Sequence, residues 1–137
     1  MIEPGKVKVL VVEDEEILLT ALSEELKQEG FNVIGAHDGM EGVEMAVKEK
    51  PDLILMDLVM PRLDGIGALK QMKESAEIKE IPVVILTNLS DYEKISDALA
   101  LGAMDYLVKA NYKLEDLVTK IKSVIERRNA AAAAQTV

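Results

Sequence analysis

Residues 53–61 of the chain read LILMDLVMP. Four consecutive apolar residues lead directly into Asp57, and Pro61 follows four positions later. An apolar run of this length is typical of a strand in a parallel sheet that helices cover on both faces. Ligands of open parallel sheets bind beyond the carboxyl ends of the strands. The stretch therefore predicts a central strand and places Asp57 where a functional residue is expected.

Four similar segments surround this one. They are residues 7–12 (VKVLVV), 31–34 (FNVI), 83–86 (VVIL) and 104–108 (MDYLV), and we expect each to be a strand. The intervening segments carry apolar residues at helical spacing around residues 18–26, 40–47, 66–73 and 117–125. The alternation of strand and helix predicts an α/β fold.

Local signals agree with this division of the chain. Ser90 and Glu93 form a capping-box pattern that predicts the start of a further helix. Gly30 and Gly102 stand where helix C-caps are expected, and Asp38-Gly39 is interpreted as a turn.

The composition favours one folded domain and excludes several classes of protein. The chain has 137 residues, 49% of them hydrophobic, no Cys and a formal net charge of -9. Without Cys there are no disulfides or thiolate zinc sites, and the acidic balance argues against direct binding of nucleic-acid phosphates. No apolar run approaches the roughly 20 residues that a membrane span requires. We expect a cytoplasmic protein with no membrane insertion.

The last nine residues differ in composition from the rest. Residues 1–128 are assigned to the folded domain, and residues 129–137, with five alanines, to an Ala-rich tail. The tail is interpreted as disordered, as a helical extension, as a truncated linker or as a remnant of an expression vector. It is too short for an effector domain, so we expect the chain to act through another protein or to be a fragment of a longer one.

The residues that follow the expected strands form one set. Glu13 and Asp14 follow the first strand, Asp57 the third, Thr87 the fourth and Lys109 the fifth. Taken singly, each is compatible with an ordinary role, such as a turn, a first helical turn or a surface lysine. Together, carboxylates this close would repel one another, so a bound cation explains them best, and oxygen ligands suit Mg²⁺. A divalent ion beside a carboxylate, a hydroxyl and an ammonium indicates phosphoryl transfer.

Four motifs give the chain a resemblance to a known family. They are residues 9–15 (VLVVEDE), 57–65 (DLVMPRLDG), 86–87 (LT) and 102–109 (GAMDYLVK). With these motifs in this order, the chain from about Lys6 to Arg128 resembles the receiver domain of two-component response regulators. The resemblance implies a doubly wound five-stranded parallel sheet in the order 2-1-3-4-5 with five helices, a flavodoxin-like three-layer sandwich.

The resemblance also implies a role for each site residue. Asp57 would accept a phosphoryl group from a histidine kinase, a phosphotransfer protein or a small phosphodonor. Thr87 and Lys109 would bind the phosphoryl oxygens, and Tyr106 would be a switch residue that turns inward. The ligands of Mg²⁺, or of Mn²⁺ in its place, would be Glu13, Asp14, Asp57 and the backbone carbonyl of Val59.

Four positions depart from the family pattern or are informative within it. Glu13 stands where the family usually has Asp, and we expect its extra methylene either to turn direct metal ligation into contact through a water or to shift the affinity for the metal. Ala110 follows Lys109 where the family usually has a cis-proline, so we expect either a trans bond with a rearranged loop at residues 111–112 or a strained cis bond. Val59 and Leu89 would flank the phosphoryl group, and because both are apolar we expect a long-lived aspartyl phosphate.

The function implied is a phosphorylation-dependent signalling switch rather than an enzyme with an external substrate. Its partners would be a sensor histidine kinase or phosphotransfer protein and a downstream protein effector, which reads the face formed by the fourth helix, fifth strand and fifth helix. The chain would be a monomer or a weak dimer. Two alternatives are a Mg²⁺-dependent hydrolase with an aspartyl-phosphate intermediate, disfavoured because Val59 replaces its usual second acid, and an adaptor that no longer takes phosphate.

Two further features receive ordinary interpretations. His37, the only histidine, is expected to pack at the surface or in a turn. Gly65-Ile66-Gly67 lacks the third glycine of a dinucleotide-binding fingerprint and is interpreted as loop flexibility.

Overall fold

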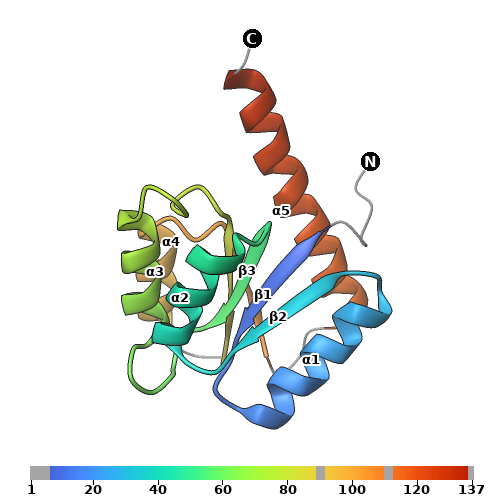
Figure 1. Cartoon of the computed structure of the whole chain (residues 1–137), viewed down its shortest axis with the longest axis vertical. Coiled ribbons are helices and arrows are strands. Elements are labelled where there is room, and N and C mark those ends of the chain that lie inside the picture. The colour runs from blue at the N-terminus through green and yellow to red at the C-terminus, as the bar shows by residue number, and fades with distance from the viewer. Residues whose placement is uncertain (1–6, 89–91, 110–112, 136–137) are drawn as a thin grey trace.

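A computed structural model describes residues 7–88, 92–109 and 113–135, in which strands and helices alternate along the chain (Figure 1). The strands are β1 (Lys8–Val12), β2 (Asn32–Ala36), β3 (Leu53–Asp57), β4 (Val83–Thr87) and β5 (Asp105–Val108). The helices are α1 (Glu16–Gln28), α2 (Gly39–Glu49), α3 (Gly65–Glu74), α4 (Tyr92–Ala100) and α5 (Leu114–Gln135).

The strands form one parallel sheet in the order β2-β1-β3-β4-β5, as the resemblance implied. In register, Val12 lies beside Met56, Asp57 beside Leu86, and Thr87 beside Val108. The carboxyl ends of β1, β3, β4 and β5 therefore meet at one edge of the sheet. The residues that end these strands are brought together there.

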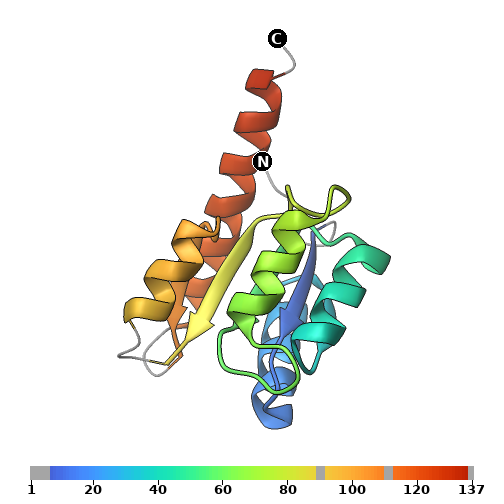
Figure 2. The ribbon, with the colours of Figure 1, turned by 90° about the vertical axis from the view of Figure 1, so that its left-hand side faces the viewer.

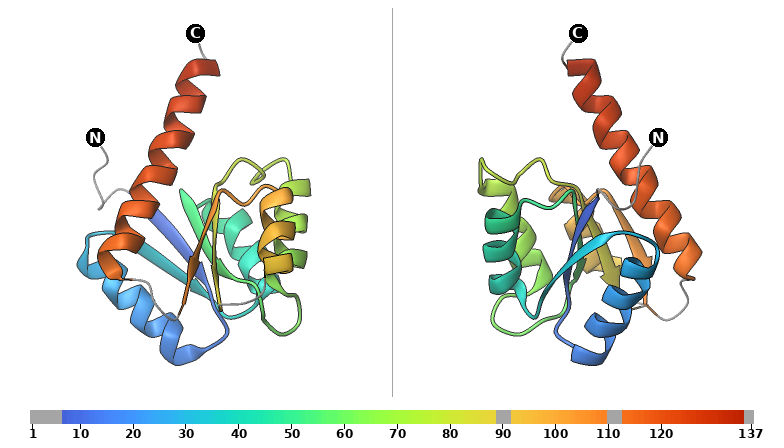
Figure 3. Two further views of the ribbon diagram at one scale, coloured as in Figure 1. Left: turned by 180° about the vertical axis from the view of Figure 1, so that it is seen from behind. Right: turned by 45° about the vertical axis from the view of Figure 1, so that its right-hand side comes forward.

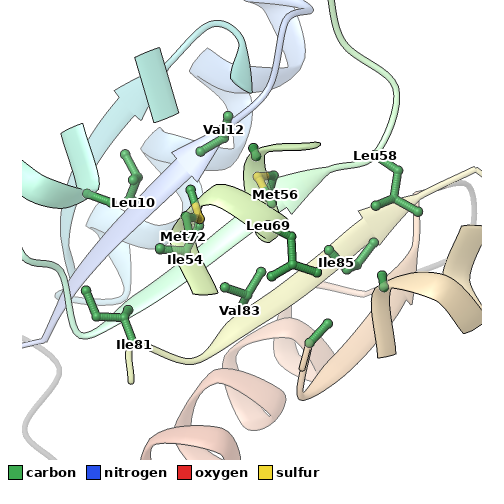
Figure 4. Packing of buried hydrophobic residues seen from close by; sticks show 14 of the residues in the cluster. Leu10, Val12, Ile54, Met56, Leu58, Leu69, Met72, Ile81, Val83 and Ile85 are labelled. Atoms are coloured by element: carbon green, nitrogen blue, oxygen red, sulfur yellow. The ribbon is translucent and has the colours of Figure 1, made fainter. Parts of the chain in front are cut away.

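Helices cover the sheet on both faces (Figure 3). Helices α2, α3 and α4 pack on one face through a buried cluster that includes Ala46, Leu69 and Ile95 (Figure 4). Helices α1 and α5 pack on the other through a cluster that includes Leu22 and Ile121. All residues of β3 and β4 are buried, which explains their continuous apolar sequence.

Helix α5 is much longer than the strands of the sheet that it covers. It runs from Leu114 through Gln135 and projects beyond the edge at which the strands begin (Figure 2). This edge is opposite the one that gathers the carboxyl ends of the strands. The backbone of residues 129–135 is thus helical. In the described part of the chain, no helix is long and apolar enough to cross a membrane.

Glycines after α1 and α4 adopt the left-handed backbone that a helix C-cap requires. Gly30 has φ 95° and Gly102 has φ 110°, as predicted from their positions. The predicted start of α4 at Ser90 lies outside the described residues.

Two sequence interpretations are wrong. Asp38-Gly39 is the start of α2 rather than a turn, because the Asp38 side chain accepts a hydrogen bond from the Glu41 amide and caps the helix. Gly65 and Gly67 lie in the first turn of α3 rather than in a flexible loop. The Asp64 carboxylate caps this helix by accepting from Gly67 N at 2.8 Å.

Candidate functional site

Three carboxylates converge at the carboxyl edge of the sheet. Glu13, Asp14 and Asp57 each offer one oxygen, and these three oxygens lie within 4.8 Å of one another. Glu13 is 0% exposed and Asp57 is 5% exposed, whereas Asp14 is open to solvent. The strand order explains the cluster, because β1 and β3 are neighbours and both end here. One exposed member gives an ion access to two buried ones.

Lys109 supplies the positive charge of the cluster. Its Nζ atom donates to Asp57 Oδ2 at 2.9 Å and lies 2.8 Å from Glu13 Oε1 and 3.9 Å from Glu15 Oε1. Burial lowers the pKa of Lys109, but the Glu13 and Asp57 carboxylates outweigh that effect and leave the pKa raised. Lys109 is therefore held as an ammonium between two buried acids.

Glu13 is the least satisfied group of the site. Burial raises the pKa of its carboxyl, assisted by the nearby Asp57 charge and opposed by Lys109 and by the Glu15 amide, which donates to Oε2 at 3.1 Å. Although Oε1 lies at ion-pair distance from Lys109, no donor among the described residues meets it at a hydrogen-bonding angle. A buried oxygen in this state costs free energy. A cation beside it would relieve that cost, so the donor set fits a hard divalent ion.

Thr87 and Val59 flank Asp57. Thr87 ends β4 and is buried, and its hydroxyl donates to the Asn88 carbonyl at 3.3 Å. The Val59 amide donates to Asp57 Oδ1 at 3.4 Å, a long hydrogen bond, while the Val59 side chain is exposed. Asp57 therefore has one oxygen firmly bound to Lys109 and one that is only weakly engaged.

Tyr106 lies on β5 and is 39% exposed rather than buried. Its neighbour on β4 is Ile85, two residues before Thr87. Leu89 and the loop at residues 110–112 lie outside the described residues. The Lys109–Ala110 bond therefore lies outside them as well.

His37 is exposed, as predicted, and its ring nitrogens lie 3.4 Å from Glu16 and 3.2 Å from Glu41. Arg62 makes a paired hydrogen bond to Asp38, a contact with no counterpart among the sequence predictions. The capping role of Asp38 could have been recognised, since an aspartate directly precedes a helical apolar stripe. The contact with Arg62 joins residues 24 positions apart and has no local signal in the sequence.

The comparisons with known proteins agree with this geometry. A family model described as "Response regulator receiver domain" matches residues 9–122. The chain is 41% identical over 121 residues to the transcriptional regulatory protein PdtaR of Mycobacterium tuberculosis, covering 88% of this chain and 57% of that protein. It is 37% identical over 126 residues to the transcriptional regulatory protein PhoP of Bacillus subtilis, covering 91% and 51%. The chain thus spans about half the length of these curated relatives.

Solved structures show the same similarity. A response regulator receiver domain protein from Clostridium thermocellum superposes with a TM-score of 0.84 at 28% identity, covering 91% of this chain and 98% of that one. The receiver domain of a sensor histidine kinase from Pseudomonas aeruginosa, described with a magnesium ion coordinated in its active-site cleft, gives a TM-score of 0.81 at 28% identity, covering 88% and 98%. The family match, the strand order and the grouping of charged residues at one sheet edge lead to one conclusion: this chain belongs to the receiver domains of two-component response regulators.

Proposed function

We propose that this chain is a phosphorylation-controlled switch in which Asp57 accepts a phosphoryl group in a Mg²⁺-dependent reaction. The observation that carries the proposal is the environment of the Asp57 carboxylate. It is buried, it is bound through Oδ2 to Lys109, and it shares a cluster with the carboxylates of Glu13 and Asp14. The arrangement places the attacking carboxylate beside the Lys109 ammonium and beside a candidate cation site. These two positive charges would neutralise the negative charge of a phosphoryl group.

The metal would be held by Asp14 and Asp57, by Glu13 directly or through a water, and by the Val59 carbonyl. Magnesium suits this set because it prefers oxygen ligands and keeps several waters, which the exposed side of Asp14 allows. The similar receiver domain from Pseudomonas aeruginosa, with its magnesium ion in the active-site cleft, supports the choice of ion. When bound, the ion neutralises charge that develops on the phosphoryl oxygens.

The chain's own residues would divide the reaction between them. An oxygen of Asp57 attacks the phosphorus of a phosphohistidine, so a P–O bond forms while the P–N bond breaks. The electron pair of the broken bond leaves on the imidazole nitrogen, which takes up a proton. Oδ1 suits the attack because its one described hydrogen bond, from Val59 N, is long. Lys109 remains paired with Oδ2 of Asp57 and also binds a phosphoryl oxygen. The Thr87 hydroxyl turns away from the Asn88 carbonyl to bind another phosphoryl oxygen.

The phosphorylated state would be read on the face formed by α4, β5 and α5. Movement of Thr87 would leave room behind it, and the exposed Tyr106 ring would turn inward to fill that room. The partner upstream would be a sensor histidine kinase or phosphotransfer protein, and the partner downstream a protein effector. Regulation of transcription belongs to the longer relatives named above and would reach this chain only through such an effector.

The test is intact-mass analysis after incubation with acetyl phosphate and Mg²⁺. We expect a phosphoryl adduct on the wild-type chain and on Asp97→Asn, a matched control at an exposed aspartate of α4. Chelation of Mg²⁺ and the substitution Asp57→Asn should each remove the adduct. Absence of the adduct from wild type, or an equal adduct on Asp57→Asn, would exclude the proposal.

A further inference from the structure

The loop of residues 58–64, between β3 and α3, is fastened to the start of α2 by a side-chain ion pair. Arg62 Nε donates to Asp38 Oδ2 at 2.8 Å, and an Arg62 terminal nitrogen donates to Asp38 Oδ1 at 3.1 Å. A two-point contact between a guanidinium and a carboxylate restricts the angle as well as the distance between two groups. The pair therefore fixes the orientation of the loop relative to α2.

The backbone of Arg62 shows that this position is under constraint. Its φ is 62°, in the left-handed region that side chains other than glycine rarely occupy. An unfavourable conformation of this kind persists only where surrounding contacts impose it, and it clusters at functional sites. A short turn closes across Arg62, where the Leu63 amide donates to the Pro61 carbonyl at 2.7 Å, and the bidentate contact with Asp38 acts at the same strained residue.

A backbone contact reinforces the pair. The Gly39 amide donates to the Leu63 carbonyl at 3.0 Å, and a side chain at position 39 would collide with that carbonyl. Asp38 and Gly39 at the start of α2 thus hold two consecutive residues of the loop. Only glycine permits this approach of the helix to the loop.

Asp38 is itself held in place. Its carboxylate caps α2 by accepting from Glu41 N at 2.9 Å. The Arg62 guanidinium, followed by this backbone hydrogen bond, keeps the pKa of Asp38 below its usual range. Asp38 therefore stays charged at neutral pH and is a rigid anchor on a helix end.

We propose that the Arg62–Asp38 pair is a positioning latch that fixes the Val59 main chain beside Asp57 and thereby sets the affinity of the site for Mg²⁺. This inference rests on the proposed function, in which the Val59 carbonyl is a metal ligand. Val59 is three residues before Arg62, and its own link to Asp57 is the long 3.4 Å hydrogen bond. At the near end the loop is anchored by Leu58, which is buried and accepts from Gly65 N at 2.8 Å. At the far end the latch acts together with the hydrogen bond from the Gly39 amide to the Leu63 carbonyl.

The test compares Mg²⁺ dissociation constants, measured by isothermal titration calorimetry, with thermal unfolding in the absence of Mg²⁺. Arg62→Ala removes the pair, and Asp38→Ser removes it while keeping a capping oxygen on α2. We expect each to weaken Mg²⁺ binding by about tenfold, at the lower end of the range of roughly 10–100-fold seen when supporting residues of metal ligands are removed. The double variant should bind no more weakly than either single one, because both substitutions break the same contact.

Two further substitutions separate charge from backbone strain. Arg62→Lys keeps the charge but lacks the planar fork, so its affinity should lie between those of wild type and Arg62→Ala. Arg62→Gly removes the pair but adopts the left-handed conformation without strain, so it should bind Mg²⁺ better than Arg62→Ala. The matched control is Arg128→Ala, which removes an arginine that contacts Asp52 at the opposite end of β3. It should bind Mg²⁺ as wild type does.

The outcomes are distinguishable. If Arg62→Ala, Arg62→Lys and Asp38→Ser lower the unfolding temperature but bind Mg²⁺ as wild type does, the pair is merely structural and the latch is excluded while the proposed function stands. Equal weakening in Arg128→Ala would exclude it as well. If wild type itself binds no Mg²⁺, the metal-dependent function fails and the latch fails with it.

Discussion

At the scale of single residues, Lys109 decides the electrostatic balance of the site. It lies between two buried acids, Glu13 and Asp57, with its Nζ atom 2.8 and 2.9 Å from their oxygens. Removing one member of a buried ion pair leaves an uncompensated charge, which is strongly destabilising. The ammonium thus keeps both carboxylates together.

The exposed Val59 side chain leads to a prediction about the lifetime of the phosphorylated state. The resemblance places this residue beside the phosphoryl group, and an apolar side chain cannot orient an attacking water. Val59→Asn should therefore accelerate loss of the phosphoryl group by about tenfold, less than the roughly 10²–10⁴-fold of a positioned general acid or base, because Asn can only orient the attacking water. The rate is measured by intact mass after removal of the phosphodonor. Val47→Asn, at a similarly apolar but remote position of α2, is the control. An unchanged rate in Val59→Asn would contradict the prediction.

His37 gives a pH-dependent prediction. The hydrogen bond to Glu41, opposed by partial burial and assisted by the Glu41 and Glu16 charges, raises the pKa of His37. A raised folded-state pKa means that the contribution to stability is present in full below the unfolded-state pKa of about 6.5 and is lost as the pH rises through the folded-state pKa. His37→Gln should cost a few tenths of a kcal/mol near pH 5.5 and almost nothing near pH 8.5, as expected for exposed ion pairs. Denaturant unfolding at the two pH values measures the difference, and an equal cost at both would contradict it.

At the scale of elements, the start of α3 is packed against the strand that carries Asp57. A side chain at Gly65 would collide with the Asp57 carbonyl and would come within 2.6 Å of Leu58 Cα, both backbone atoms that cannot move aside cheaply. At Gly67, in the same helical turn, the nearest atom is a methyl carbon of the flexible Leu63 side chain, also at 2.6 Å. The two glycines therefore differ in what they approach rather than in their helical position.

Alanine substitutions at these glycines should have unequal effects. Gly65→Ala should lower the free energy of unfolding by about 1–3 kcal/mol because it overpacks a rigid contact. Gly67→Ala should be close to neutral, because improved helix propensity offsets the displacement of Leu63. Urea unfolding measures both. Equal losses would show that helix geometry rather than contact with the site explains the glycine at position 65.

The elements also show what the sequence can predict. Each strand lies close to its predicted position, because a continuous apolar run such as residues 53–56 is typical of a buried strand and is too short for a buried helix. The start of α2 was misinterpreted, since Asp-Gly has the same local preferences in a turn and at a helix N-terminus. An aspartate caps a helix only where the following residues are helical. The apolar residues at helical spacing that begin at Met40 are the signal that favours a helix start over a turn.

At the scale of the whole molecule, the topology explains the location of the site. The strand order places β1 beside β3 and β3 beside β4, so residues far apart in sequence become neighbours at one edge. The site set could be predicted because parallel strands end at the same edge. The Arg62–Asp38 and Lys109–Glu13 contacts could not, because they depend on side-chain directions that no periodicity encodes.

The position of the phosphoryl group can be located chemically. The chain is treated with acetyl phosphate and Mg²⁺, the acyl phosphate is reduced with borohydride, and the peptides are sequenced by mass spectrometry. We predict reduction of the side chain at Asp57 and at no other carboxylate, and none when Mg²⁺ is chelated. Reduction at Asp14 or Glu13 in place of Asp57, or at Asp57 to the same extent without Mg²⁺, would contradict a metal-dependent switch centred on Asp57.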